Sequence, residues 1–459
     1  MKAIMEQWLS DHHSKIAIRF NNLILTYNQL FVLSAQAGNL FVKHKADKIL
    51  FCLYNSPSDV ICYLGSWLAG KTAIPLNPRL TNLEIIKVIE QFKPDIVVVE
   101  NERLTADLSD CCNNLSVKLY STINDSNYQG TFWDSLLQQR SSLPKGYSQN
   151  SKTIHLTSGT MGQYKVVEHS LSQIEKYARR RAKDFGYERD DKILIVTSLN
   201  HAFSFSYQLL PALVLGLDIT LVPKFDPEKV YKTILKNNIT TTGLLPIMCY
   251  QLSRYAAGEK KIASLRYVIV AGDSVPSAFN NNFKQVFDVE LYQGVGMTEV
   301  YGYAQNKINN NKIGSAGKIL PGVELKIVNK SDQQIATNQV GELTLKTEMN
   351  LKKYAGDHEL SKQVIKNGWL KTGDIGYIDE DGFLWFLGRS KQIIISGGSN
   401  ISPMEVEQAL YHHSGIMEAG VIGKPDIIWG EVIWAYVSVT SEYKFSESEL
   451  IEFTLDLIA

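Results

Sequence analysis

Short apolar runs alternate with amphipathic stretches in the first 100 residues. Apolar, β-branched segments at 48–54, 72–78 and 94–100 predict buried strands. Between them, apolar residues recur at helical spacing over 58–70, with Gly70 as a stop signal, and over 81–92, with Thr81 as an N-cap. Strands that alternate with helices in this way predict a parallel sheet covered by helices.

The same alternation returns between residues 191 and 274. Strand-like runs at 191–199, 217–223, 239–246 and 264–274 are separated by helical patterns around 208–216 and over 227–238. The chain therefore predicts two similar α/β layered sub-domains, one after the other.

The pattern changes after about residue 310. Short strand-like runs broken by glycines and polar turns, with an Asp-Gly hairpin signal at Asp381–Gly382, predict a small antiparallel, β-barrel-like unit. After Arg389 a strand, a helix over 403–411 and two further strands predict a small C-terminal α+β domain. We expect an α/β fold with a large N-terminal domain at 1–389 and a small domain at 390–459, with the boundary near Ser390 and Lys391.

Composition and charge narrow the class of protein. The 459 residues carry 47 Lys plus Arg and 47 Asp plus Glu, so a basic surface for nucleic acid is not expected. The five cysteines form no Cys-x-x-Cys pair, which indicates neither a zinc site nor a disulfide framework. No stretch predicts a membrane span or a signal peptide, and we expect a cytoplasmic protein.

One stretch, "HLTSGTMGQYKVVEHS" at 155–170, concentrates glycines and hydroxyl side chains. Such a loop lets backbone N–H groups approach a polyphosphate, and a lysine adds a positive charge. The glycine spacing is not that of a Walker loop. A solvated turn between two strands is the alternative. The candidate phosphate-binding residues are Thr157, Ser158, Gly159, Thr160, Gly162 and Lys165.

Further glycine-punctuated motifs follow in a fixed order: "GMTE" at 296–299, "KTGD" at 371–374, "GRSK" at 388–391 and "GGSNISPMEVE" at 397–407. Together with the 155–170 stretch, this set resembles the adenylate-forming superfamily of acyl- and aryl-CoA synthetases and adenylation domains. The resemblance runs from about Leu25 to Glu431. It implies an acid–thiol ligase that uses ATP and Mg²⁺ to activate a carboxylic acid as an acyl-adenylate, and then forms a thioester with CoA or a phosphopantetheine thiol.

The resemblance also implies roles for single residues. Thr298 matches the threonine near the α-phosphate, and Glu299 matches the glutamate that binds Mg²⁺. Asp374 and Arg389 match the residues that contact the ribose, and Lys165 matches the loop lysine. Each has a structural alternative: a helix-start carboxylate for Glu299, a turn residue for Asp374, and a surface cation for Arg389.

Two further parts of the pattern concern movement and the second substrate. Lys391 matches the hinge about which the small domain rotates between the half-reactions, although an exposed linker lysine is the alternative. Gly397 and Gly398 match the loop that lines the thiol tunnel.

The acid pocket is expected around His201, Ala202, Gly294 and Gly296, with Phe203, Phe205 and Tyr207 as apolar neighbours. Amino-acid-activating members carry an aspartate at the position of Ala202, and an unpaired buried ammonium is costly, so an aryl or acyl acid is favoured over an α-amino acid. His201 has a structural alternative as a histidine that follows a strand.

Three departures from the family pattern stand out. Tyr164 replaces a proline before the loop lysine, and Val295 replaces the ring that stacks on adenine. The chain stops at "TLDLIA", before the segment with the lysine that contacts the carboxylate and α-phosphate, so the small domain is expected to be truncated.

The alternatives to a CoA ligase are an enzyme that loads an acyl carrier protein and a catalytically impaired nucleotide-binding homologue.

Overall fold

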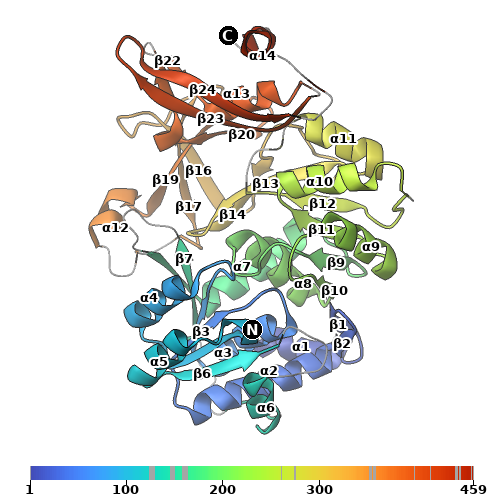
Figure 1. Ribbon diagram of the computed structural model, residues 1–459. Helices are drawn as coiled ribbons and strands as arrows, with labels where there is room; N and C mark the ends of the chain where they lie inside the picture. Colours follow the sequence, from blue (N-terminus) through green and yellow to red (C-terminus); the bar gives the residue numbers. More distant parts are fainter. Residues whose placement is uncertain are drawn as a thin grey trace.

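Four β-sheets organise the chain in the computed structural model. It describes residues 2–123, 130–144, 150–157, 164–259, 261–272, 275, 277–350, 354, 358–396, 399–413, 415–439, 443, 446–455 and 457. Figure 1 shows the first sheet at one end of the molecule and the C-terminal sheet at the other. The α/β class with an added β unit and a small C-terminal domain is confirmed.

The first sheet has the strand order β6-β5-β3-β4-β7-β8, in which β8 is antiparallel to β7 and the other pairs are parallel. Its strands are β3 (Lys48–Cys52), β4 (Thr72–Pro75), β5 (Ile96–Glu100), β6 (Lys118–Thr122), β7 (Lys152–Thr157) and β8 (Lys165–Ser170). The helices in this part of the chain are α2 (Tyr27–Lys43), α3 (Pro57–Leu68), α4 (Asn82–Phe92), the 3-10 helix η1 (Asn101–Arg103), α5 (Ala106–Asn114) and α6 (Thr131–Leu137). Thr81 caps α4 with a capping box closed by Glu84, as its position predicted.

The second sheet has the order β15-β14-β13-β12-β11-β9-β10-β1-β2. Its strands are β1 (Ile16–Phe20), β2 (Leu23–Thr26), β9 (Lys192–Ile195), β10 (Asp218–Leu221), β11 (Thr241–Leu244), β12 (Tyr267–Val270), β13 (Leu291–Met297), β14 (Tyr301–Gln305) and β15 (Lys318–Ile319). The accompanying helices are α1 (Lys2–Asp11), α7 (Leu171–Asp184), α8 (Leu210–Leu215), α9 (Pro227–Asn237), α10 (Pro246–Ala256) and α11 (Ser277–Phe287). The N-terminal hairpin β1–β2 thus completes the second sheet, not the first.

Two antiparallel sheets follow. The third contains β16 (Val323–Val328), β17 (Gly341–Thr347), β18 (Ile365–Lys366), β19 (Trp369–Ile378) and β20 (Leu384–Arg389), with α12 (His358–Val364) beside it. The fourth contains β21 (Ile394–Ser396), β22 (Ser399–Ile401), β23 (Ile416–Asp426) and β24 (Gly430–Val439), with η4 (Ser390–Gln392), α13 (Pro403–Leu410) and α14 (Glu447–Leu455). The Asp-Gly signal forms the turn between β19 and β20, where Gly382 has a φ of +81°.

The two α/β layers share one apolar core. Tyr63 of α3 stacks on Phe205 from the second layer with ring centroids 5.0 Å apart. Trp67, also fully buried, donates through Nε1 to Thr153 Oγ1 at 3.0 Å. Because aromatic pairs and apolar area are buried between the layers, the two sub-domains form one unit that fixes the relative positions of their strand ends.

A π-helix, η3 (Ser204–Leu209), precedes α8 and was not predicted. The amide N–H of Leu210 bonds to the carbonyl of Phe205, five residues earlier. Pro211 has no N–H for the carbonyl of Tyr207, and the hydroxyl of Tyr187 donates to that oxygen at 2.8 Å instead. A proline inside the helical pattern was therefore the signal for the irregular turn, and such turns are frequent at functional sites.

Asp59 of α3 is a buried carboxyl group that the fold does not satisfy. It is 0% exposed, and neither carboxyl oxygen has a hydrogen-bond partner among the described residues. Burial, and secondarily the Glu100 carboxylate, raises the pKa of Asp59 well above its ordinary value. Since a raised carboxyl pKa means that the folded state holds the proton more tightly, this group lowers stability as the pH rises above its unfolded pKa.

We expect Asp59→Asn to stabilise the protein increasingly as the pH rises. Between the unfolded and folded pKa of Asp59, the free energy of unfolding should gain about 1.4 kcal/mol per pH unit relative to the wild type. Chemical unfolding at pH 4, 6 and 8 measures this gain. A difference between the two proteins that is the same at all three pH values would contradict the assignment.

Candidate functional site

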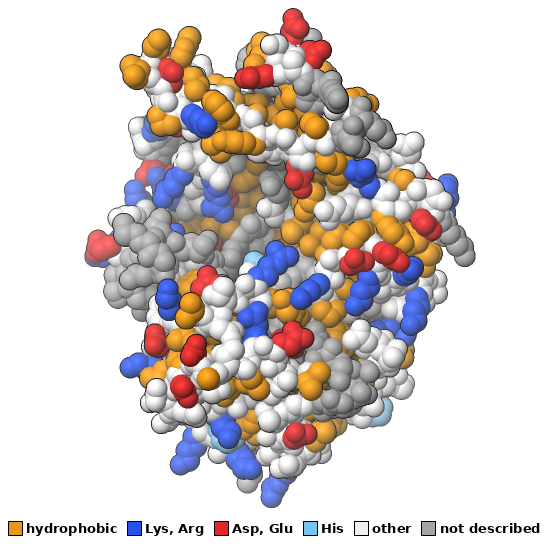
Figure 2. Space-filling view, viewed as in Figure 1, with side chains coloured by type: hydrophobic (Ala, Val, Ile, Leu, Met, Phe, Trp, Pro, Cys, Tyr) orange, Lys and Arg blue, Asp and Glu red, His pale blue; other side chains and the backbone are white. Residues whose placement is uncertain are grey.

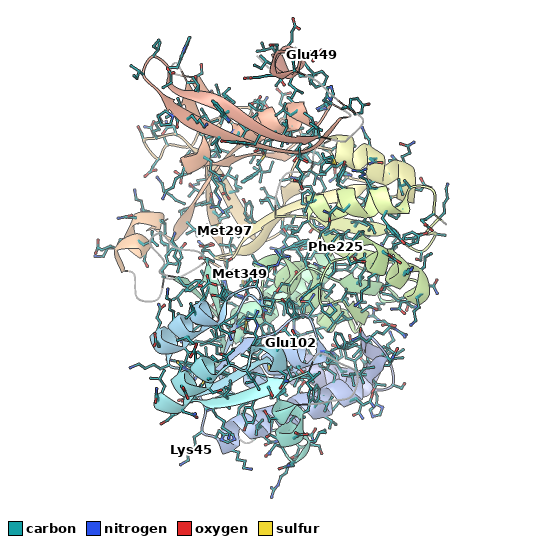
Figure 3. The ribbon with its side chains drawn as sticks, viewed as in Figure 1. Lys45, Glu102, Phe225, Met297, Met349 and Glu449 are labelled. Atoms are coloured by element: carbon teal, nitrogen blue, oxygen red, sulfur yellow. The ribbon has the colours of Figure 1, made fainter. Side chains whose placement is uncertain are left out.

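A cavity of about 1180 Å³ opens where the strand ends of the two α/β layers meet. Residues that follow β3, β4, β9, β10 and β12 line it, as expected for ligand sites at the carboxyl ends of parallel strands. Met297 and Phe225, both labelled in Figure 3, come from β13 and from the segment after β10 and both line the cavity. Figure 2 shows Lys and Arg side chains gathered around a hollow on this face of the molecule.

The charge of the lining is strongly one-sided. Among the lining residues in the described part of the chain, Glu299 is the only acid. Four basic side chains also line the cavity: Arg79, Lys165, Lys224 and Arg389. Low-dielectric walls strengthen such a field, so the cavity is suited to a polyanionic ligand.

The hairpin β7–β8 brings the two described ends of the predicted phosphate-binding segment to the cavity. Thr157 pairs with Lys165 in the antiparallel register, and both residues line the cavity. Ser158, Gly159, Thr160 and Gly162 lie outside the described residues. The segment does join two strands, as the alternative interpretation required, but the position of Lys165 on the cavity wall favours ligand binding.

Thr298 and Glu299 lie in the turn between β13 and β14 and both line the cavity. No helix begins there, so the interpretation of Glu299 as a helix-start carboxylate was wrong. Glu299 is 8% exposed, and its Oε1 accepts a hydrogen bond of 2.7 Å from the hydroxyl of Tyr354.

Two buried histidines support this turn from behind. His169 Nε2 lies 2.8 Å from the carbonyl oxygen of Thr298, and His155 Nε2 lies 3.1 Å from the Tyr301 hydroxyl. Burial lowers the pKa of His169 to about 4 and that of His155 to about 3. Both rings are therefore neutral at pH 7, and His169 donates its Nε2–H to the Thr298 carbonyl. The sequence analysis missed these residues.

Asp374 and Arg389, 15 positions apart in the chain, are register partners on β19 and β20. Arg389 Nε lies 2.9 Å from Asp374 Oδ1, and the Tyr303 hydroxyl donates to Oδ2 at 3.1 Å. Burial raises the pKa of Asp374 to about 6, although Arg389 opposes the shift. Asp374 is a buried strand residue and not a turn residue, and Arg389 reaches the cavity wall.

The predicted acid pocket is partly assembled. The expected residues that line the cavity are His201, Ala202, Phe203, Tyr207 and Gly296. Gly294 does not line it, and Phe205 is fully buried in the core instead. A Cβ atom on Gly294 would lie 3.1 Å from the Tyr207 ring, whose hydroxyl donates to the Val295 carbonyl at 2.9 Å. Gly294 therefore lies behind Tyr207, and only the tyrosine of this expected pair forms the cavity wall.

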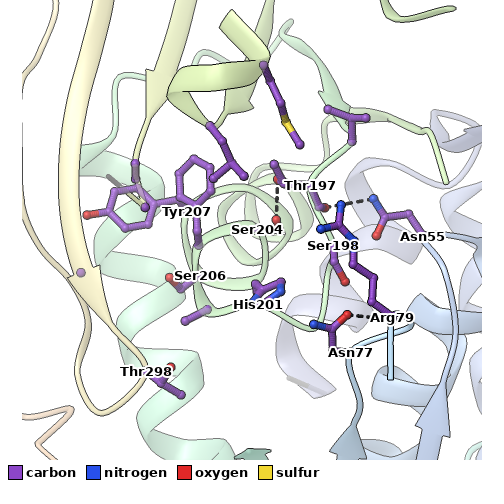
Figure 4. Close-up of a pocket in the computed structure, with 18 of the residues that line it drawn as sticks. Asn55, Asn77, Arg79, Thr197, Ser198, His201, Ser204, Ser206, Tyr207 and Thr298 are labelled. Atoms are coloured by element: carbon purple, nitrogen blue, oxygen red, sulfur yellow. Dashed lines mark hydrogen bonds between the residues drawn. The ribbon is translucent and has the colours of Figure 1, made fainter. Parts of the chain in front are cut away.

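Figure 4 shows Asn77 and Arg79 on one side of the cavity and Tyr207 and Thr298 on the other. His201 lies between these two sides. Burial, and secondarily Arg79, lowers the pKa of His201, which favours a neutral ring. Asn77 and Arg79 were not predicted. The signal for them was their position just after the strand β4, since ligand-binding residues gather at such strand ends.

Among the described residues, Lys391 and Val295 do not line the cavity. Lys391 is exposed in η4, between the third and fourth sheets. Gly397 and Gly398 lie outside the described residues. Val295 packs against the apolar cluster of the β unit instead of lining the cavity.

Within the described residues, no helix has the length and apolar character needed to span a bilayer.

Comparisons with known proteins show the family of the chain. The model of the AMP-binding enzyme family matches residues 5–355, and the model of the AMP-binding enzyme C-terminal domain matches residues 405–456. An indoleacetate–CoA ligase of Aromatoleum aromaticum is 30% identical over 94% of this chain and 88% of its own. A 2-succinylbenzoate–CoA ligase of Bacillus velezensis is 28% identical over 97% of this chain and 89% of its own.

Solved structures share the fold at lower identity. ATP-bound MatB from Rhodopseudomonas palustris superposes with a TM-score of 0.91 at 22% identity, covering 99% of this chain and 92% of its own. The anthranilate CoA ligase AuaEII gives a TM-score of 0.91 at 23% identity, covering 100% of this chain and 90% of its own. The predicted enzyme class, an AMP-forming acid–thiol ligase, is confirmed, and the chain belongs to the AMP-binding enzyme family.

Proposed function

We propose that the protein uses ATP to convert an aryl or acyl carboxylic acid to its acyl-adenylate and then transfers the acyl group to CoA. The observation that carries this proposal is the convergence of Lys165, Thr298, Glu299 and Arg389 on one cavity that also has an apolar wall. Charged and apolar walls in one cavity suit two ligands of different character, a nucleotide and an organic acid.

Different side chains of the protein bind different parts of the nucleotide. Lys165 and the 157–162 segment bind the β- and γ-phosphates and stabilise the charge of the leaving pyrophosphate. Thr298 donates its hydroxyl near the α-phosphate, where the acid's carboxylate attacks. Asp374 accepts hydrogen bonds from the ribose hydroxyls, while Arg389 donates to the same sugar. Positioning and charge stabilisation of this kind account for most of the catalysis in phosphoryl chemistry.

Glu299 fits a hard divalent cation. Its carboxylate is close to fully buried on the cavity wall, and the Tyr354 hydroxyl contacts Oε1, which leaves Oε2 for a second ligand. Oxygen ligands from one carboxylate and from ATP are the usual set for Mg²⁺. When bound there, Mg²⁺ supplies neutralisation of the phosphate charge.

The acid is best accommodated by the apolar wall of Phe203, Tyr207 and Met248. The described lining holds no carboxylate besides Glu299 to pair with an α-ammonium group, and Ala202 stands where an aspartate would do so. An α-amino acid would therefore place an unpaired cation in the pocket. Two relatives named for aromatic acids, indoleacetate and 2-succinylbenzoate, support an aryl acid.

A substrate panel tests this proposal. ATP–pyrophosphate exchange should be strong with one or more aryl or aliphatic acids and weak with all standard amino acids. The acceptor is then identified by incubating the preferred acid with CoA or with a phosphopantetheinylated carrier protein and measuring the thioester by mass spectrometry. Exchange with amino acids alone would overturn the acid assignment, and transfer to the carrier protein alone would overturn CoA as the acceptor.

The division of the chain at Ser390–Lys391, with Lys391 as the hinge, belongs to the same proposal. The change from the third sheet to the fourth falls at η4, and Lys391 is exposed there. Gly397 and Gly398 would line the thiol tunnel after the small domain rotates.

We expect Lys391→Pro to slow thioester formation at least 10-fold with little change in acyl-adenylate formation, because proline fixes φ at the hinge. Rapid-quench assays of the two half-reactions separate these effects. Equal slowing of both would argue against a hinge at Lys391.

A further inference from the structure

Tyr354 is a buried residue from outside every motif that the sequence analysis singled out. It is 5% exposed, and its ring packs with Val167 of β8 and with Leu360, Val364 and Ile365. Its backbone N–H donates to Ser361 Oγ at 2.9 Å. The ring is thus held from one side by the strand of Lys165 and from the other by α12 and β18.

This side chain contacts two residues of the candidate site at once. Its hydroxyl donates to Glu299 Oε1 at 2.7 Å. The Lys165 ammonium lies over its ring, 5.7 Å from the centroid, within the range of cation–π attraction. Glu299 and Lys165 come from β-turn and strand segments more than 130 positions apart in the chain, and Tyr354 is a single contact that links them.

We propose that Tyr354 is a positioning residue that orients the Glu299 carboxylate for the metal ion and holds Lys165 over the phosphates; this rests on the proposed function. The hydroxyl fixes the rotation of the carboxylate by a charge-assisted hydrogen bond to Oε1, which would leave Oε2 available to a cation. Hydrogen-bonding partners of metal ligands commonly change metal affinity or activity by 10- to 100-fold when removed.

The chemistry of the hydroxyl suits this role. The phenol hydroxyl is the donor of the 2.7 Å hydrogen bond to Glu299, because a carboxylate oxygen can only accept. A neutral donor also adds no charge that would repel the cation, as a lysine or arginine in this place would.

Tyr354→Phe tests the proposal, since it removes the hydroxyl and keeps the ring under Lys165. ATP binding is to be measured by titration calorimetry with and without Mg²⁺. A Mg²⁺ titration then gives the Mg²⁺ concentration at which half of the metal-dependent gain in ATP affinity is reached. The variant should require about 10-fold more Mg²⁺, with an unchanged ATP affinity in the absence of metal. Tyr354→Leu removes the ring as well and should also weaken metal-free ATP binding.

Tyr27→Phe is the matched control. It removes another fully buried hydroxyl, which donates to the Leu217 carbonyl at 2.7 Å. Tyr27 does not line the cavity. It should reproduce any loss of stability without the change in Mg²⁺ requirement. If Tyr354→Phe does not fold, Ser361→Ala, which frees the backbone N–H of Tyr354, should shift the Mg²⁺ requirement in the same direction by a smaller factor.

The outcomes separate this inference from the proposed function. A wild-type protein whose ATP binding ignores Mg²⁺ would overturn the proposed function itself. A Mg²⁺-dependent wild type with an unchanged requirement in the Tyr354→Phe protein, or in the Ser361→Ala protein if only that one folds, would overturn the role of Tyr354 alone. An equal shift in the Tyr27→Phe protein would reduce the effect to general stability and overturn it as well.

Discussion

Glu299→Gln is expected to lower the kcat of acyl-adenylate formation by about 10²–10³-fold, the usual effect of losing one preorganised electrostatic group. Glutamine keeps the shape of the side chain and can still accept the hydrogen bond from Tyr354, so the turn between β13 and β14 should remain in place. The carboxylate charge, which we assign to the metal ion, is lost. Because the effect falls on the transition state, the KM for the acid should change little.

Steady-state release of pyrophosphate at saturating Mg²⁺ measures this effect. Glu168→Gln is the control, since Glu168 lies on β8 close to Lys165 in sequence but pairs with Lys152 at the surface. It should retain the wild-type rate. A Glu299→Gln protein within 3-fold of the wild type would remove Glu299 from the metal site.

The second large effect is expected from Asp374→Asn, which should weaken ATP binding by about 10- to 100-fold. Hydrogen bonds to a charged group contribute about 1.5–3 kcal/mol, and the substitution removes both an acceptor for the ribose and the charge that holds Arg389. Equilibrium binding of ATP measures the loss. Asp332→Asn, which removes a surface carboxylate paired with Lys366 in the same β unit, should leave ATP affinity unchanged.

The pH dependence of binding gives an independent check on Asp374. Its pKa of about 6 means that the carboxylate becomes protonated as the pH falls through 6 and can then no longer accept two hydrogen bonds while pairing with Arg389. Wild-type ATP affinity should therefore fall between pH 7 and pH 5. The Asp374→Asn protein should lack this component, and an identical pH profile in both proteins would contradict the assignment.

The sequence predicted much of the architecture because local signals and the fold agree. Thr81 and Glu84 form the expected capping box at the start of α4, and β-branched runs such as 96–99 became buried strands. The pairing of strands was harder to predict from the sequence. Nothing in the local pattern of β1 shows that it joins β10, about 200 residues later, because parallel pairing depends on long-range packing.

The residues of the candidate site likewise fall into those that motifs predicted and those that depend on tertiary packing. Lys165, Thr298, Glu299 and Arg389 belong to motifs, and the fold brings all four to one cavity. Tyr207 was expected in the pocket and lines it, but Gly294 was misplaced, because a sequence does not show that the ring of Tyr207 lies between the glycine and the cavity.

His169 and Tyr354 were missed for a related reason. Alternation along β8 predicts that His169 is buried, and an isolated tyrosine near α12 predicts nothing specific. Their importance comes from partners 129 and 55 positions away, the Thr298 carbonyl and the Glu299 carboxylate. Such contacts depend on tertiary geometry, which local periodicity does not contain.

Hydroxylamine trapping of the acyl-adenylate tests directly whether the protein forms adenylates. The 459-residue protein and any longer product of its gene are each incubated with Mg·ATP, hydroxylamine and a panel of aryl and aliphatic acids. We predict acid-dependent formation of a hydroxamate and AMP, strongest with an aryl acid and lost in Glu299→Gln. ATP binding without any hydroxamate from either protein, across the whole panel, would contradict an adenylate-forming function and favour a nucleotide-binding protein without this activity.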